Sequence, residues 1–282
     1  MSETPKKAAI TGHPVAHSRS PLVHGYWLKK HGIDGDYGRV DVAPEEAQAF
    51  YRNFAASGLT GANVTVPHKE TAAVACDRLD EAARTMGAAN TIWLDEDGRL
   101  CGANTDWEGF LGNLDQGAPG WDAKPGTAVV LGAGGAARAI VFALLARKFT
   151  HVHIVNRTVE KAQKIVDEFG SGTSAHGWDN LGKLLGKADL LVNTTALGMT
   201  GKPLLEIDLS ELPKTALVTD AVYVPLETDL LKQASARGNP TVDGLGMLLH
   251  QAVPGFERWF GVRPEVDDDL RALVLKDLGA AS

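Results

Sequence analysis

The chain has 282 residues, 44% of them hydrophobic, and carries 28 lysine and arginine side chains against 35 acidic ones. A formal net charge of −7 without a basic block argues against nucleic acid as a partner. The longest unbroken apolar run, residues 139–146, is too short to span a membrane, and residues 1–12 lack the apolar stretch of a signal peptide. The only two cysteines, Cys76 and Cys101, fit a reducing compartment, so we expect a cytoplasmic protein.

The first hundred residues alternate between strand and helix patterns. Strand patterns lie at residues 8–11, 36–42, 63–66, 91–94 and 99–103, and helical patterns at residues 21–31, 45–56 and 69–79. The turn residues 95–98, Asp-Glu-Asp-Gly, predict a hairpin between the last two strands. Strands separated by helices are typical of βαβ units, which predicts an α/β fold with a mostly parallel sheet.

A second α/β series follows residues 113–127, which are rich in Gly, Pro and polar side chains and predict a loop between two domains. Its strand patterns lie at residues 128–131, 151–155, 188–192, 217–220 and 240–242, and helical patterns follow Gly244 and occupy residues 266–278. We therefore expect domains at residues 1–106 and 107–245, with residues 246–282 completing the first.

A glycine-rich turn follows the first strand of this second series. Gly132, Gly134 and Ala137 form the pattern G-x-G-x-x-A between an apolar strand and a helix. The first glycine permits the tight turn, the second lets backbone approach a pyrophosphate, and the third small residue allows close helix–strand packing. Such a turn also occurs as a purely structural feature, but its strand-turn-helix setting favours dinucleotide binding at the helix N-terminus.

The end of the next strand indicates which dinucleotide binds. An NAD site usually carries an acidic residue there, on the ribose 2′-hydroxyl. This chain has Asn156, Arg157 and Thr158, with Lys161 one helical turn later. Arg157 and Lys161 are suited to a 2′-phosphate, so we favour NADP. The alternative is that these charges are merely solvated and that Thr158 is an ordinary helix N-cap.

Polar residues also follow strands of the first domain. Ligands of open α/β sheets bind beyond the carboxyl ends of the strands, so these residues together predict a pocket for a small polyhydroxylated ligand. The set comprises Ser18, Ser20, Asn63, Thr65, Lys69, Asn90, Asn104, Thr105 and Asp106. Each also has a structural explanation, as a helix cap, an exposed strand face or a solvated charge.

A metal site is not expected. His13, His17 and His24 are interrupted by prolines, which prevents helical i, i+4 spacing, and no further ligand type clusters near them. His151 and His153 share one strand face and are expected to pack or to lie on the surface.

Eight motifs in this order resemble those of the shikimate dehydrogenases. They run from residue 12 to about residue 251: GHPVAHSRSP, GANVTVPHKE, AANT, GANTDWEGF, GAGGAARA, NRT, DAVYVPLET and DGLGMLLHQA. The resemblance implies an N-terminal α/β substrate domain followed by a C-terminal Rossmann-type dinucleotide-binding domain. It also implies a monomer or homodimer that reversibly reduces 3-dehydroshikimate to shikimate with NADPH, in aromatic amino acid biosynthesis.

The same resemblance implies roles for individual residues. Lys69 and Asp106 are the implied catalytic pair, with Lys69 as the proton donor and acceptor. The implied substrate-binding residues are Ser18, Ser20, Asn63, Thr65, Asn90, Tyr223 and Gln251. The implied cofactor-binding residues are Gly132, Gly134, Gly135, Ala136, Asn156, Arg157, Thr158, Lys161, Thr195, Met199, Gly244 and Met247.

Three features depart from the family pattern. The segment NTTALGM around Thr195 replaces the more usual serine or proline variants, with little consequence expected for the nicotinamide site because Gly198 and Met199 remain. His68 replaces a larger apolar residue and is expected at the surface, and Lys161 replaces an arginine, which weakens the expected preference for NADP. Three other assignments stay open. They are a quinate/shikimate dehydrogenase that uses NAD, against which Arg157 argues, a non-catalytic dinucleotide sensor, and a folate-type methylene dehydrogenase.

Overall fold

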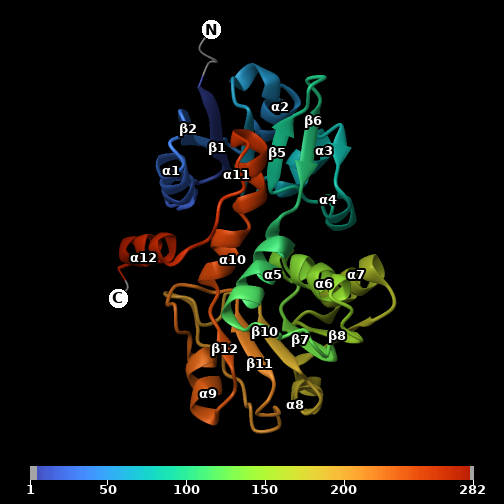
Figure 1. Ribbon diagram of the computed structural model, residues 1–282. Helices are drawn as coiled ribbons and strands as arrows, with labels where there is room; N and C mark the ends of the chain where they lie inside the picture. The colour runs from blue at the N-terminus through green and yellow to red at the C-terminus, as the bar shows by residue number, and fades with distance from the viewer. Residues whose placement is uncertain (1–4, 280–282) are drawn as a thin grey trace. The chain divides into compact units, whose positions relative to one another are not determined.

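The computed structural model describes residues 5–279, and the chain divides into two compact units, each with its own sheet (Figure 1). Unit 1 comprises residues 1–105 and 251–282, and unit 2 comprises residues 106–250. Asp106 and residues 246–250, expected with the first domain, fall in unit 2. Within residues 5–279, no helix is long and apolar enough to cross a membrane.

Unit 1 is built on a mixed sheet with the strand order β2-β1-β3-β5-β6-β4. Its strands are β1 (Lys6–Gly12), β2 (Gly35–Asp41), β3 (Gly61–Val64), β4 (Arg78–Leu79), β5 (Thr91–Leu94) and β6 (Leu100–Ala103). β1 pairs in parallel with β2 and β3, and β4 pairs in parallel with β6. β5 is antiparallel to both of its neighbours, β3 and β6, and it forms the expected hairpin with β6.

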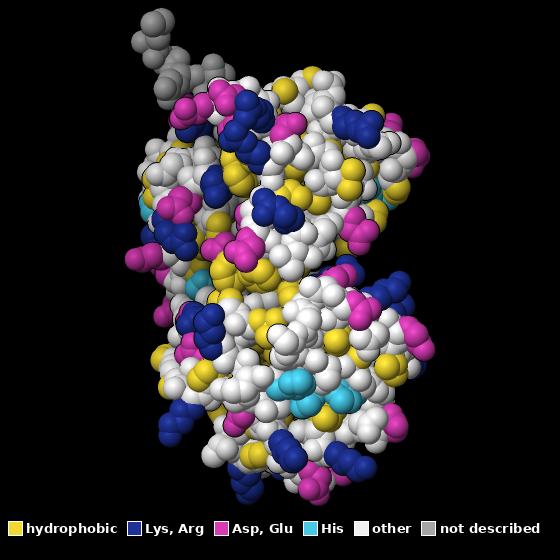
Figure 2. All heavy atoms as spheres, turned by 90° about the vertical axis from the view of Figure 1, so that its right-hand side faces the viewer, with side chains coloured by type: hydrophobic (Ala, Val, Ile, Leu, Met, Phe, Trp, Pro, Cys, Tyr) yellow, Lys and Arg dark blue, Asp and Glu magenta, His cyan; other side chains and the backbone are white. Residues whose placement is uncertain are grey.

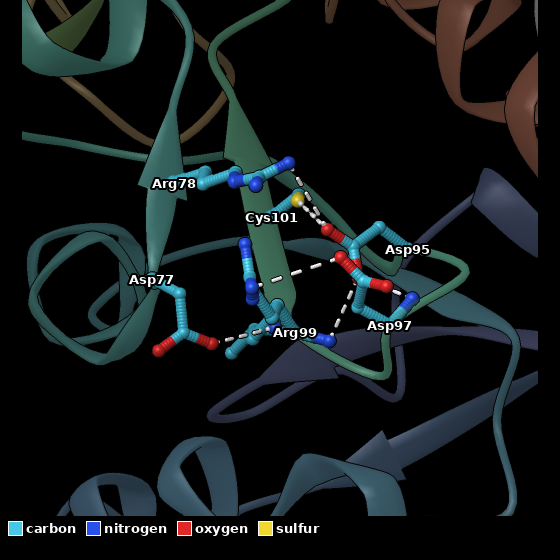
Figure 3. A network of polar contacts seen from close by, with 7 residues as sticks. Asp77, Arg78, Asp95, Asp97, Arg99 and Cys101 are labelled. Carbon is cyan, nitrogen blue, oxygen red and sulfur yellow. Dashed lines mark hydrogen bonds and ion pairs between the residues drawn. The ribbon is translucent and has the colours of Figure 1, made fainter.

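The hairpin turn is organised by the carboxylate of Asp95 (Figure 3). Its Oδ1 atom accepts hydrogen bonds from the backbone N–H groups of Asp97 (3.0 Å) and Arg99 (2.9 Å), and Arg78 reaches its Oδ2 atom (3.4 Å). These bonds lower the pKa of Asp95, the backbone N–H of Arg99 having the largest effect. The turn predicted from the Asp-Glu-Asp-Gly sequence is thus closed by the side chain of its first residue, Asp95.

The helices of unit 1 cover the sheet with a core rich in aromatic residues. They are α1 (Ser20–Lys30), α2 (Ala47–Arg52), η1 (Phe54–Ser57), α3 (Lys69–Ala75), α4 (Glu81–Met86), α11 (Val253–Phe260) and α12 (Asp268–Asp277). Trp27, Phe256 and Trp259 are fully buried, so α11, although far from α1 in the sequence, completes the core begun by α1. The helix expected over residues 69–79 ends at Ala75, because residues 78–79 pair with β6 instead.

Unit 2 contains a parallel sheet with the strand order β12-β11-β10-β7-β8-β9. Its strands are β7 (Thr127–Leu131), β8 (His151–Val155), β9 (Thr173–His176), β10 (Leu190–Asn193), β11 (Leu217–Asp220) and β12 (Thr241–Val242). All were expected except β9, whose sequence Thr-Ser-Ala-His carries no long apolar side chain. The order 6-5-4-1-2-3 within this unit is the doubly wound arrangement of dinucleotide-binding sheets.

Helices cover both faces of this sheet. They are α5 (Asp106–Gly117), α6 (Gly135–Ala146), α7 (Val159–Phe169), η2 (Trp178–Asn180), α8 (Leu181–Leu185), α9 (Asp229–Arg237) and α10 (Leu245–His250). Side chains of β7 alternate between the two faces: Ala128 and Val130 join one apolar cluster, and Val129 and Leu131 the other. α5 runs to Gly117, so the loop expected over residues 113–127 begins later.

Candidate active site

In unit 1, a buried polar network joins residues expected to bind substrate. The Ser18 hydroxyl donates to the Ser20 hydroxyl (3.2 Å), and Ser20 is hydrogen-bonded to Tyr37. The Tyr37 hydroxyl in turn donates to Oδ1 of Asn63 at 2.6 Å. The Ser18 hydroxyl also accepts a hydrogen bond from the backbone N–H of Ser20 (3.3 Å), the first residue of α1, whereas the N-cap residue Arg19 makes no side-chain cap bond. Tyr37, which nothing in the sequence singled out, links the serines to Asn63.

The network continues from Asn63 into the strands that follow. The Asn63 amide donates to the Thr91 hydroxyl (3.3 Å), and Thr91 donates to Oδ1 of Asn90 (3.1 Å). Asn90 also accepts a hydrogen bond from the backbone N–H of Thr105 (2.8 Å) and donates to Gln251 (3.4 Å). Residues expected from five separate motifs thus meet within one unit, although Asn63 and Asn90 are themselves only 3% and 2% exposed.

His24 lies behind this network and is fully buried. Its Nε2 atom bonds to Oδ1 of Asn63 (3.1 Å), and its ring stacks on Tyr37 with centroids 3.9 Å apart. The Nδ1 atom is buried and has no hydrogen-bond partner. Burial lowers the pKa of His24 to about 3, against a smaller raising effect of Asn63. The imidazole is therefore neutral and donates its single proton to Asn63.

Lys69 is the first residue of α3, just beyond β3. Its carbonyl accepts a hydrogen bond from the backbone N–H of Ala89 (2.9 Å), which holds it beside the segment of Asn90. The expectation that His68 lies at the surface is wrong: its side chain is 1% exposed and its Nε2 atom bonds to the Val42 carbonyl (2.7 Å). The buried imidazole anchors the backbone immediately before Lys69.

Two other expected residues lie near element ends. Thr65 follows β3 and is partly buried, and its backbone N–H donates to the Thr11 carbonyl at 2.9 Å. Asp106 is the first residue of α5 in unit 2, where a carboxylate is favourable to the helix dipole.

Unit 2 contains a cavity of about 770 Å³ at the carboxyl ends of its strands. Most of the residues expected to bind the cofactor line it: Gly132, Gly134, Asn156, Arg157, Thr158, Lys161 and Thr195. Thr158 is the N-cap residue of α7 but makes no side-chain cap bond, so its structural explanation does not hold. Trp178, Leu204 and Glu206 also line the cavity and were missed, since they belong to no recognisable motif.

The glycine loop fits a pyrophosphate for two separate reasons. Gly132 has φ +106°, and a Cβ atom there would lie 2.6 Å from the Thr194 hydroxyl, so the turn itself requires glycine. Gly134 has φ −98°, and a Cβ atom there would meet nothing within 4 Å. The absence of a side chain at Gly134 therefore leaves open space in front of α6, where backbone N–H groups attract an anion.

The other residues expected to bind the cofactor are not among those that line this cavity. Gly135 and Ala136 are in the first turn of α6, and Met199 is 38% exposed. Gly244 and Met247 border a narrow gap beside Asp220 that has no room for a water molecule. Tyr223, expected to contact substrate, is partly buried in the loop between β11 and α9.

Histidine side chains gather on the surface of unit 2 (Figure 2). The Ser174 hydroxyl lies 2.8 Å from a ring nitrogen of His151, 2.8 Å from one of His153 and 2.7 Å from one of His176. Burial lowers the pKa of His153 to about 4, and the other two imidazoles add to the effect. Among residues 5–279, no three or more His, Cys, Asp and Glu side chains are arranged to hold a metal ion.

Three family models match the chain. The first, described as the shikimate dehydrogenase substrate binding domain, covers residues 10–92. The second, described as shikimate/quinate 5-dehydrogenase, covers residues 119–209, and the third, the shikimate 5′-dehydrogenase C-terminal domain, covers residues 244–274.

Individual relatives match nearly the whole chain. A shikimate dehydrogenase (NADP(+)) of Azorhizobium caulinodans is 60% identical over 275 residues, covering 98% of each chain. Among solved structures, quinate dehydrogenase from Corynebacterium glutamicum in complex with NAD is 30% identical, with a TM-score of 0.87 and 96% and 99% of the two chains covered. Shikimate 5-dehydrogenase from Thermus thermophilus in complex with NADP(H) and shikimate is 34% identical, with a TM-score of 0.78 and 95% and 98% covered.

Proposed function

Because the chain belongs to the shikimate dehydrogenase family and is an NADP-dependent oxidoreductase, we propose that it reduces 3-dehydroshikimate to shikimate, reversibly, with Lys69 and Asp106 as the catalytic pair. Unit 1 holds the substrate and unit 2 holds the cofactor. The product serves aromatic amino acid biosynthesis.

The polar network of unit 1 is the observation that carries the substrate assignment. Ser18 and Ser20 supply hydroxyl groups for the substrate carboxylate, with help from Thr65 and Tyr223. Asn90 and Gln251 meet at 3.4 Å and supply amide groups for ring hydroxyls. Because Tyr37 and Thr91 tie these residues to Asn63, the hydroxyl and amide groups are held in place before a ligand arrives.

Lys69 supplies the proton. NADPH, when bound, would supply the hydride for the carbonyl carbon, so the carbonyl oxygen requires a proton from the protein. The Lys69 ammonium donates this proton from Nζ and stabilises the developing negative charge, while Asp106 orients the ammonium and a neighbouring hydroxyl. A cation is unfavourable in the first turn of a helix, so the position of Lys69 in α3 is better explained by chemistry than by helix stability.

The cofactor preference follows from the cavity of unit 2. Arg157 and Lys161 offer two positive charges and Thr158 a hydroxyl for the 2′-phosphate of NADP, and no acidic residue follows β8 directly. Lys161 binds as a point charge without the planar fork of arginine, so measurable turnover with NAD is also expected.

The proposal is tested by oxidation at alkaline pH, where release of a proton favours the reaction. Shikimate and quinate are offered separately, each with NADP⁺ and with NAD⁺. The wild type is compared with Lys69→Met and with Lys29→Met, which removes an exposed lysine of α1. NADPH binding, followed by fluorescence, reports whether each variant is folded.

We expect shikimate with NADP⁺ to be the best pair and Lys69→Met to lose at least about a hundredfold in kcat, the scale of general acid–base catalysis, with NADPH binding unchanged. Lys29→Met should behave as the wild type. Quinate or NAD⁺ as the better reactant would contradict the substrate or cofactor assignment. Full activity in Lys69→Met would contradict the role of the lysine.

A further inference from the structure

Asp220 is a buried carboxylate that the proposed chemistry does not use. It is the last residue of β11 and is 1% exposed. Three neutral donors bond to it: the Asn193 amide (2.9 Å) and the Val222 backbone N–H (2.9 Å) at Oδ1, and the Thr228 hydroxyl (2.8 Å) at Oδ2. Desolvation dominates these bonds and raises the pKa of Asp220 to about 6.

One of these donors fixes the loop that borders the cofactor cavity. Asn193 ends β10, the neighbour of β11 in the sheet (Figure 1). Its Oδ1 atom accepts hydrogen bonds from the backbone N–H (3.0 Å) and the hydroxyl (2.8 Å) of Thr195, and Thr195 accepts one from the N–H of Leu197 (3.1 Å). Because the Asn193 amide is oriented by Asp220, the position of Thr195 depends on that carboxylate.

The other two donors fix the loop that carries Tyr223. Val222 directly precedes Tyr223, and Thr228 ends the loop as the N-cap residue of α9, where its hydroxyl accepts from the Leu231 N–H (3.4 Å). Both ends of the segment 222–228 are thus fastened to one carboxylate. Tyr223 lies inside this closed segment.

We propose that Asp220 is a positioning residue that holds the Thr195 loop and the Tyr223 loop in the geometry needed to bind NADP and shikimate. This inference rests on the proposed function for the roles of the two loops. An ionised carboxylate accepts all three hydrogen bonds, whereas an asparagine places an NH₂ group at one oxygen position and cannot accept there. A carboxylate charge buried this deeply lowers the stability of the fold. We therefore explain the presence of Asp220 by the geometry that it imposes on the two loops.

The test compares Asp220→Asn with two variants of one donor, Thr228→Val and Thr228→Ser. Asp189→Asn is the matched control, because Asp189 accepts the Thr127 N–H (2.8 Å) at the opposite end of the same sheet. For each variant we measure thermal unfolding, the Kd of NADPH by fluorescence, and kcat and KM for shikimate with NADP⁺.

We expect Asp220→Asn to raise both the Kd of NADPH and the KM of shikimate by about tenfold, the equivalent of one hydrogen bond to a charged group. Thr228→Val removes only the bond that fastens the Tyr223 loop, so it should raise the KM of shikimate by a similar factor and leave the Kd of NADPH unchanged. Thr228→Ser keeps the hydroxyl and should keep the wild-type KM, and Asp189→Asn should change only the melting temperature. Lower melting temperatures with unchanged Kd and KM would overturn the proposal. If the wild type does not oxidise shikimate, the proposed function fails, while the Kd of NADPH still tests the dependence of Thr195 on Asp220.

Discussion

The buried imidazole of His24 makes the stability of unit 1 depend on pH in a way that can be calculated. The native state holds the ring neutral, with a pKa of about 3, whereas an unfolded histidine titrates near 6.5. Because the native pKa is lowered, stability is fully present above about pH 6.5 and is lost as the pH falls towards 3. At pH 4.5 the unfolded state binds this proton and the native state does not.

The size of the effect follows from the two pKa values. At pH 4.5 the medium lies two units below the unfolded pKa, and each unit corresponds to about 1.4 kcal/mol. After subtraction of the small effect already present at pH 7, protonation of His24 in the unfolded state lowers the free energy of unfolding at pH 4.5 by about 2.5 kcal/mol. His24→Phe keeps an aromatic ring against Tyr37 and forfeits one hydrogen bond to Asn63, at a cost of about 1 kcal/mol at neutral pH.

The assay is urea unfolding of the wild type and of His24→Phe at pH 7 and pH 4.5, followed by tryptophan fluorescence, since Trp27 and Trp259 pack beside the imidazole. The wild type should be the more stable protein at pH 7, and His24→Phe should be the more stable one at pH 4.5. His31→Gln, at the exposed end of α1, is the control and should keep the pH dependence of the wild type. An equal loss of stability on acidification in wild type and His24→Phe would refute the reasoning.

Two glycine substitutions test packing and cofactor binding separately. Gly61→Ala should lower the free energy of unfolding in urea by about 3 kcal/mol or more. The new Cβ atom would lie 2.0 Å from Nε1 of Trp259 and 2.5 Å from the Ile92 carbonyl oxygen, which accepts a hydrogen bond from that indole at 3.1 Å. A stability change below about 1 kcal/mol would contradict this packing. Gly134→Ala should leave the melting temperature unchanged, since its Cβ atom meets nothing within 4 Å. It should weaken NADPH binding by about tenfold or more, because the methyl group would take up open space where we propose that the pyrophosphate binds; unchanged binding would place the pyrophosphate elsewhere.

Most elements of both sheets were predictable because their patterns are local. The apolar strands of unit 2 and the glycine turn after β7 can be recognised from a few adjacent residues, as can the Asp-Gly hairpin of unit 1. The exceptions have a common cause. β4 and β9 are short or poor in apolar side chains, and they exist as strands because a neighbouring strand offers them hydrogen bonds.

The candidate site divides in the same way. Residue type and order along the chain by themselves pointed to NADP through Arg157 and to a polar substrate through Ser18 and Asn90, since these side chains have the chemistry that such ligands require. Only the tertiary structure decided that His68 is buried, that Tyr37 connects Ser20 to Asn63, and that Asp220 holds two loops at once. Burial and hydrogen bonding between distant residues depend on how whole elements pack, and no local pattern in the chain records that packing.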